Sequence, residues 1–189
     1  MPIRDALQVL ATEGLVDLVS GATAVVTPMS VAELQELYEM REALEPAATR
    51  LAVPNMGRAE VIQLRRCFEA MTETKVPTEF LAANAAFHRI ICAQANRPRM
   101  AETVEQLRKL TDRYLYLHLE VFEKRDLLLK EHAQIVDAVE AGDGAQAASL
   151  TCHHLETAHN FILQYMLEHP VLDRRAPIGA LQATSGSTA

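Results

Sequence analysis

Most of the chain places apolar residues every three to four positions, which is the spacing of amphipathic helices. The first long segment of this kind follows Ser30-Val31-Ala32-Glu33, a pattern typical of a capping box in which Ser30 caps the helix and Glu33 reaches back. Helices are predicted at about 31–51, 58–71, 78–95, 100–122, 125–141 and 144–168. The pattern therefore predicts an all-α fold, an antiparallel helical bundle of about six to seven helices.

The first 28 residues follow a different pattern. Residues 2–13 predict a short amphipathic helix that ends at Gly14, and the Val-rich segments 15–20 and 24–27 predict a hairpin. A helix followed by a hairpin is the second half of a winged helix-turn-helix. We therefore expect a partial winged helix-turn-helix at 1–28, a helical domain at 29–170 and a disordered tail at 171–189, where small polar residues dominate.

Charge and composition narrow the setting in which the protein works. The net charge of −7 argues against a broadly basic surface for nucleic acid. Three scattered cysteines do not form a disulfide framework, and neither a membrane-spanning run nor a secretion signal is visible. These features favour a cytoplasmic location.

Histidines lie on the apolar stripes of three different predicted helices. Asn84 and His88 are four residues apart and share a helical face, while His132 and His154 each fall in the apolar stripe of a later helix. A single histidine in such a place is usually a core residue with a hydrogen-bond partner. Three together, with an amide nearby, are equally consistent with one divalent metal ion, because three nitrogens and one oxygen suit Zn, Ni, Fe or Mn.

A charged residue also lies on the buried stripe of the first long helix. Arg41 is either part of a structural ion pair, for instance with Glu45 four residues later, or an anchor for the carboxylate of a ligand. Arg113 and Tyr116 are weaker candidates for the same ligand pocket.

The chain resembles the FCD domain of the FadR branch of the GntR transcription regulators. Five segments carry the resemblance and appear in the family's order. They are Pro2-Ile3-Arg4-Asp5-Ala6-Leu7 with Glu13-Gly14-Leu15-Val16, Glu36 to Arg41 with Leu44-Glu45, Asn84-Ala85-Ala86-Phe87-His88, Glu131-His132, and Gly142-Asp143 leading to His154-Leu155.

The resemblance implies a metal site and a dimeric regulator. In metal-binding members an Asp and three His hold a divalent ion beneath the effector, and the corresponding positions here are Asn84, His88, His132 and His154. Asn in place of Asp brings no charge, so metal affinity should fall while the site keeps its 2+ charge and favours an anionic effector. The family acts as homodimers on DNA operators and performs no catalysis.

The DNA-binding part departs from the family pattern. A complete member would carry ~40 further residues before Met1, for the first two helices of the reading head. Arg4 is the one Lys or Arg among the first 30 residues and the one DNA-binding candidate there. Because phosphate contacts dominate affinity for DNA, we expect this chain alone to bind DNA weakly or not at all.

The leading hypothesis is thus a transcription regulator that responds to a small organic acid bound at the metal and Arg41. One alternative is a helical metallohydrolase that uses the same metal to activate water. Against it, Glu131 directly precedes His132 and is expected to point elsewhere, which leaves no obvious general base. The other alternative is a structural module with buried histidines and no ligand.

Overall fold

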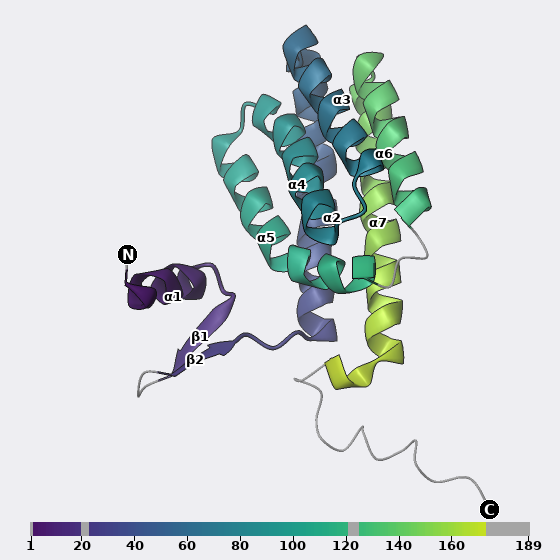
Figure 1. The fold of residues 1–189 in the computed structure, drawn as a ribbon. Helices are drawn as coiled ribbons and strands as arrows, with labels where there is room; N and C mark the ends of the chain where they lie inside the picture. Colours follow the sequence, from purple (N-terminus) through teal and green to yellow (C-terminus); the bar gives the residue numbers. More distant parts are fainter. Residues whose placement is uncertain (1, 20–22, 121–124, 173–189) are drawn as a thin grey trace, which may run out of the picture.

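The computed structural model of the chain describes residues 2–19, 23–120 and 125–172. Within these ranges a short N-terminal segment precedes a bundle of helices (Figure 1). In chain order the elements are α1 (Ile3–Thr12), β1 (Val16–Val19), β2 (Thr23–Val26), α2 (Val31–Ala52), the 3₁₀ turn η1 (Val53–Asn55), α3 (Arg58–Glu73), α4 (Pro77–Gln94), α5 (Pro98–Glu120), α6 (Arg125–Glu140), α7 (Gly144–Glu168) and the 3₁₀ turn η2 (Pro170–Leu172).

The all-α prediction is confirmed, and the predicted helices 31–51, 58–71, 78–95, 100–122, 125–141 and 144–168 correspond to α2–α7. The end predicted for the fourth of them, beyond residue 120, lies outside the described residues. So does almost all of the predicted disordered tail, since the description stops at residue 172. No helix in the described ranges is both long and apolar enough to span a membrane.

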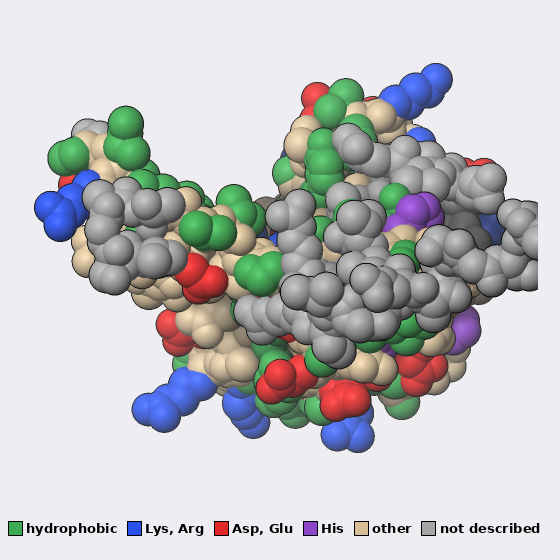
Figure 2. Space-filling model, turned by 90° about the horizontal axis from the view of Figure 1, so that it is seen from below, with side chains coloured by type: hydrophobic (Ala, Val, Ile, Leu, Met, Phe, Trp, Pro, Cys, Tyr) green, Lys and Arg blue, Asp and Glu red, His purple; other side chains and the backbone are tan. Residues whose placement is uncertain are grey.

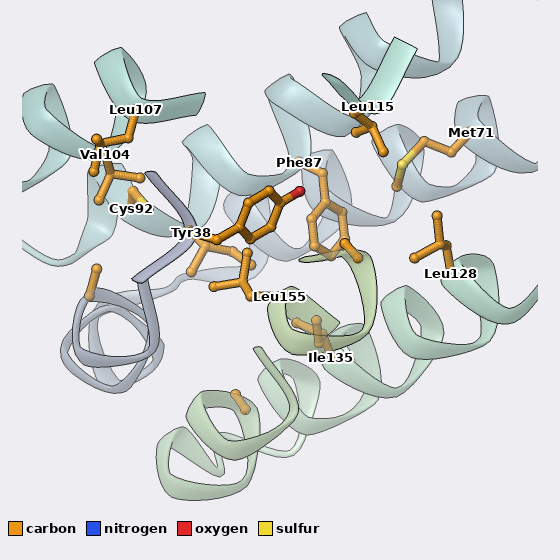
Figure 3. Packing of buried hydrophobic residues seen from close by; sticks show 14 of the residues in the cluster. Tyr38, Met71, Phe87, Cys92, Val104, Leu107, Leu115, Leu128, Ile135 and Leu155 are labelled. Atoms are coloured by element: carbon orange, nitrogen blue, oxygen red, sulfur yellow. The ribbon is translucent and has the colours of Figure 1, made fainter. Parts of the chain in front are cut away.

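Helix α2 occupies the centre of the bundle. It packs most extensively on α7 and also contacts α4 and α5 (Figure 1). The buried side chains come from every helix of the bundle, and Figure 3 shows how Tyr38, Phe87 and Leu155 pack together in its middle. Alanines on α2 and α7 allow these two helices to pack closely, because a small side chain keeps the backbones near each other.

The start of α2 differs in part from the predicted capping box. Ser30 caps the helix as expected, because its Oγ accepts the Glu33 N–H at 3.0 Å. The reciprocal half is not formed, since the Ser30 N–H donates to the Tyr114 hydroxyl at 3.2 Å instead. The Glu33 carboxylate accepts from Arg113 and Tyr114, so a tertiary contact with α5 replaces the local one.

The N-terminal segment forms a separate lobe beside the bundle (Figures 1 and 2). Strands β1 and β2 pair antiparallel, with Val16 opposite Val26, and Gly14 takes a left-handed φ of +76° where α1 turns into β1. None of the residues of α1 is buried, and Ile3 is 81% exposed. The lobe is fastened to α5 by the ion pair between Glu13 and Lys109, whose atoms are 2.8 Å apart.

Candidate metal centre

Three histidine rings meet in the middle of the bundle. His88 comes from α4, His132 from α6 and His154 from α7, and each is at most 5% exposed. Their ring centroids are 4.3–5.5 Å apart. One ring nitrogen from each lies within 4.8 Å of the others, which is the arrangement of a candidate metal site.

An oxygen atom of the protein lies beside the Nδ1 atom of each ring, within hydrogen-bond distance for His132 and His154. His132 Nδ1 is 2.7 Å from the carbonyl oxygen of Leu128, and His154 Nδ1 is 2.9 Å from Oε2 of Glu131. His88 Nδ1 lies 3.5 Å from Oε2 of Glu45. An oxygen on Nδ1 places the proton there and leaves Nε2 with a free lone pair, as in metal-binding histidines with an outer layer of carboxylates and carbonyls.

The interior also keeps the rings of His88 and His132 neutral. Burial lowers the pKa of His88 well below its usual value, and the nearby charge of Arg108 lowers it further. Burial likewise lowers the pKa of His132, with His154 as the next cause. Neutral imidazole is the form that binds a metal ion, so the environment favours the ligand state over the imidazolium.

Asn84 faces the histidines from one turn before His88 on α4. Its Oδ1 lies 2.9 Å from His132 Nε2. Because His132 Nδ1 carries the proton, two lone pairs face each other across this distance. Two ligands bound at right angles to one first-row ion, each about 2.1 Å from it, would be separated by roughly 3 Å. The residues present therefore fit a metal ion.

The Nε2 atom of His88 gives a second, independent indication of a metal ion at this site. This nitrogen is buried and has no hydrogen-bond partner among the described residues. Turning the Asn84 amide so that its nitrogen faces His132 would relieve the clash of lone pairs there, but it would leave His88 Nε2 unsatisfied. A shared cation would satisfy both.

A carboxylate lies at the centre of the charged groups behind the histidines. Glu45 on α2 is 1% exposed and lies 2.7 Å from Nε of Arg41 and 3.4 Å from Nη1 of Arg108. Burial alone would raise the pKa of Glu45, but the two guanidinium groups outweigh it and leave the pKa lowered. Arg41 also donates to the Thr111 hydroxyl at 2.9 Å, so α2 and α5 are tied together here.

A cavity opens beside the histidines and reaches Arg41. It measures about 320 Å³ when all the space between its lining atoms, out to open solvent, is included. The apolar part of its wall is formed by Phe80, Leu115, Leu128, Leu155 and Ala158. The polar residues in its lining are Tyr38, Arg41, Asn84, His88, His132 and His154.

The structure brings together five of the residues singled out in the sequence and separates three others. Arg41 lines the histidine cavity and also forms the ion pair with Glu45, so both interpretations of this residue find a basis. Arg113 does not line the cavity. It binds the carboxylate of Glu33 and the carbonyl oxygen of Thr27, where the N-terminal lobe joins α2.

Tyr116 and Arg4 are also away from the cavity. Tyr116 is half-buried on α5 and is absent from the cavity lining, while Arg4 is exposed on α1. Interpreting Arg113 and Tyr116 as pocket residues therefore needs correction. The residues of α5 that face the charged cluster, Arg108 and Thr111, lie on another side of that helix.

The expectation that Glu131 points elsewhere is wrong. Its side chain is 5% exposed and binds His154, because α6 is buried over a wide arc that includes both Glu131 and His132. Arg108 was missed altogether, although it sits four residues after Val104 on a buried stripe of α5. A charged residue on an apolar stripe, the signal that identified Arg41, could have found it.

Comparison with known proteins places the bundle in a family. The family model described as FCD domain matches residues 36–157. The probable D-xylose utilization operon transcriptional repressor of Paenarthrobacter nicotinovorans is 32% identical, over 84% of this chain and 73% of its own length. The HTH-type transcriptional repressor RspR of Escherichia coli (strain K12) is 24% identical over 89% and 75%.

Solved structures share the fold. Escherichia coli McbR/YncC superposes with a TM-score of 0.77 at 20% identity, covering 87% of this chain and 84% of its own. A putative transcriptional regulator GntR from Rhodococcus sp. RHA1 gives a TM-score of 0.72 at 22% identity, covering 86% and 79%. At these identities the likeness concerns the fold alone.

Removing the charge of Glu45 should destabilise the protein strongly. We expect Glu45→Gln to lower the free energy of unfolding by about 3 kcal/mol at neutral pH, because two buried guanidinium groups lose their carboxylate. Urea unfolding followed by circular dichroism measures the change. Glu140→Gln, which removes the carboxylate of the exposed Arg65 pair, is the control and should have little effect.

The difference in unfolding free energy between wild type and Glu45→Gln should depend on pH, and the lowered pKa of Glu45 sets the direction. Because the pKa of Glu45 is lowered in the folded state, its contribution is complete above the ordinary value of 4.5 and disappears as the pH falls through the folded pKa. The difference between wild type and Glu45→Gln should therefore shrink below about pH 4.5. A difference that stayed constant into that range would contradict the assignment of a buried, ionised Glu45.

Proposed function

We propose, from the premise that this chain belongs to the FCD-domain family of GntR-type transcription regulators, that its bundle binds a divalent metal ion and senses a small organic acid there. The family is one of DNA-binding regulators, and its named members are not enzymes. The observation that carries the proposal is the meeting of three buried histidine rings, each with a protein oxygen beside its Nδ1 atom.

The proposed metal ligands are Nε2 of His88, His132 and His154 together with Oδ1 of Asn84. Such a set of nitrogen and oxygen ligands suits Zn, Ni, Fe or Mn. When bound, the ion offers open coordination positions to an anion. All four protein ligands are neutral, so the charge of the ion is not reduced by its own ligands.

The proposed effector is a small carboxylate that contacts the ion and Arg41 in the cavity. The bonds to Glu45 and Thr111 use Nε and one terminal nitrogen of Arg41, which leaves the other terminal nitrogen as a donor for a ligand. The cavity is lined both by the proposed metal ligands and by Arg41, which supports a ligand that contacts the two together. Arg113 and Tyr116 have no place in this proposal.

The proposed domain organisation follows the sequence. Residues 1–28 would be the part of a winged helix-turn-helix that contacts DNA through α1, with Arg4 exposed for a phosphate, and residues 29–170 would be the effector domain. We expect homodimers, since two-fold symmetric regulators match paired half-sites of DNA. The contacts of Glu13 with Lys109 and of Thr27 with Arg113 are the places where the two parts meet.

Two other functions make different predictions for the same site. A metallohydrolase would convert a candidate acid, and the buried carboxylate of Glu131 lies beside the site. This carboxylate is bound to His154, however, and the relatives are named as regulators. A structural module would bind neither metal nor acid. Metal analysis separates the structural module from the sensor, and recovery of the unchanged acid separates the sensor from the enzyme.

Metal content is the first test. We expect His132→Ala to lower metal affinity by at least about 100-fold, because it removes one of three nitrogen ligands while the bundle stays helical. Purified protein is analysed by plasma mass spectrometry after equilibration with Zn, Ni, Fe or Mn. His169→Ala, which changes an exposed histidine at the end of α7, is the matched control. Equal metal content in the two variants would refute the proposed ligands.

Asn84→Asp should change metal and effector binding in opposite directions. The added carboxylate should raise metal affinity about tenfold or more, because a charged ligand attracts the ion more strongly than an amide. The same charge should weaken the binding of an anionic acid to the loaded site. Competition with a chelator measures the first change and calorimetry the second. An unchanged metal affinity would show that residue 84 does not contact the ion.

The role of Arg41 can be separated from that of the metal. In the metal-loaded protein, Arg41→Gln should weaken the binding of small acids such as acetate or lactate by about tenfold or more, through the loss of a charge-assisted hydrogen bond. The metal content should not change. Arg65→Gln, at the exposed pair with Glu140, serves as the control. Acid binding that survives Arg41→Gln unaltered would remove Arg41 from the effector site.

A further inference from the structure

A second cavity lies between α4 and α5, and it is distinct from the histidine cavity described above. It measures about 270 Å³ when the space out to open solvent is included, and His88 is the one residue in the lining of both cavities. Its polar lining residues include Arg108 and Glu105 from α5, and Cys92 and Ala101 form part of its wall. We call it the α4–α5 cavity.

Arg108 is a buried guanidinium group with weak contacts. It is 2% exposed, and its two bonds, to Oε2 of Glu45 and to the carbonyl oxygen of Asn84, are both 3.4 Å long. Its Nε is shielded from solvent and has no hydrogen-bond partner among the described residues. A guanidinium presents five N–H donors, so a buried one normally meets shorter and more numerous acceptors.

Arg108 is less closely paired than Arg41. Arg41 and Arg108 share one fully buried carboxylate, that of Glu45, and Arg41 holds it at the shorter distance of 2.7 Å. Glu105 lines the same cavity, but its carboxylate is paired with Arg89 at 2.8 Å.

Asp112 is the remaining carboxyl group near both arginines. Burial raises the pKa of Asp112, and the charges of Arg108 and Arg41 act in the opposite direction. The two guanidinium groups still share the one fully buried carboxylate beside His88, and Arg108 is the less closely paired of the two, which is unfavourable for a buried charge.

We propose that the α4–α5 cavity is a second anion site, in which a small carboxylate binds the guanidinium of Arg108. A planar carboxylate matches the fork of an arginine and would give Nε and a neighbouring terminal nitrogen short acceptors. Formate and acetate are the simplest carboxylates that offer this fork, and the Arg89–Glu105 pair lies in the lining of the same cavity. The site goes beyond the proposed sensor function, since it requires no metal.

The test uses the metal-stripped full chain and sodium formate as the probe. Formate replaces chloride at constant ionic strength, and thermal unfolding is followed by circular dichroism. We expect the unfolding midpoint to rise with the logarithm of the formate concentration, by about 3 °C at roughly ten times the dissociation constant. No rise, or a rise that is linear in the formate concentration as a general salt effect is, would overturn the proposal.

Two variants with the same loss of charge locate the effect. Arg108→Gln removes the buried guanidinium of the cavity, and Arg65→Gln removes the exposed one that pairs with Glu140. The response to formate should disappear in Arg108→Gln and persist in Arg65→Gln. A response that persists in a folded Arg108→Gln protein, or that is lost equally in Arg65→Gln, would contradict the α4–α5 site.

A third variant keeps the proposal testable should Arg108→Gln fail to fold. Ala101 is half-buried in the wall of the cavity, and Ala101→Leu fills the space without changing any charge. It should abolish the response to formate. A full response in a folded Ala101→Leu protein would overturn the site. Because the protein is free of metal throughout, these outcomes do not depend on whether the histidines bind an ion.

Discussion

The carboxylate of Glu45 is the constraint on which the centre of this protein depends. It lies in the middle of α2 and contacts one positive group from its own helix, one from α5 and the ring of His88 from α4. A buried carboxylate is tolerated only when such partners surround it. The three helices must therefore approach each other at this point, and the position of His88 is set by the same group that neutralises the arginines.

The other two rings of the candidate metal centre are also positioned by oxygen atoms of the protein. Leu128 and Glu131 hold Nδ1 of His132 and His154, and both belong to α6. Because these oxygens are fixed by a rigid helix, the lone pairs of Nε2 are aimed inward without the help of a ligand. Helix α5 then connects this centre to the N-terminal lobe, with Arg108 on the side of the cluster and Lys109 on the side of Glu13.

The sequence pattern was enough to predict the helices and the convergence of the histidines, but not the contacts around them. An apolar stripe shows that a side chain such as His132 faces the interior, and this holds for each helix separately. What that side chain meets depends on how helices far apart in the chain pack together. Arg113 illustrates the limit, since it lies near the cluster along α5 yet points to Glu33 at the other side.

Glu131 illustrates a second limit of prediction from sequence, which concerns how much of a helix surface is buried. A helix that is buried on one narrow face turns adjacent residues in different directions, and on that assumption Glu131 could not accompany His132. Helix α6 is packed against both α3 and α7, so both residues are interior. The carboxylate that was expected to be absent is thus the hydrogen-bond acceptor of a metal-ligand candidate.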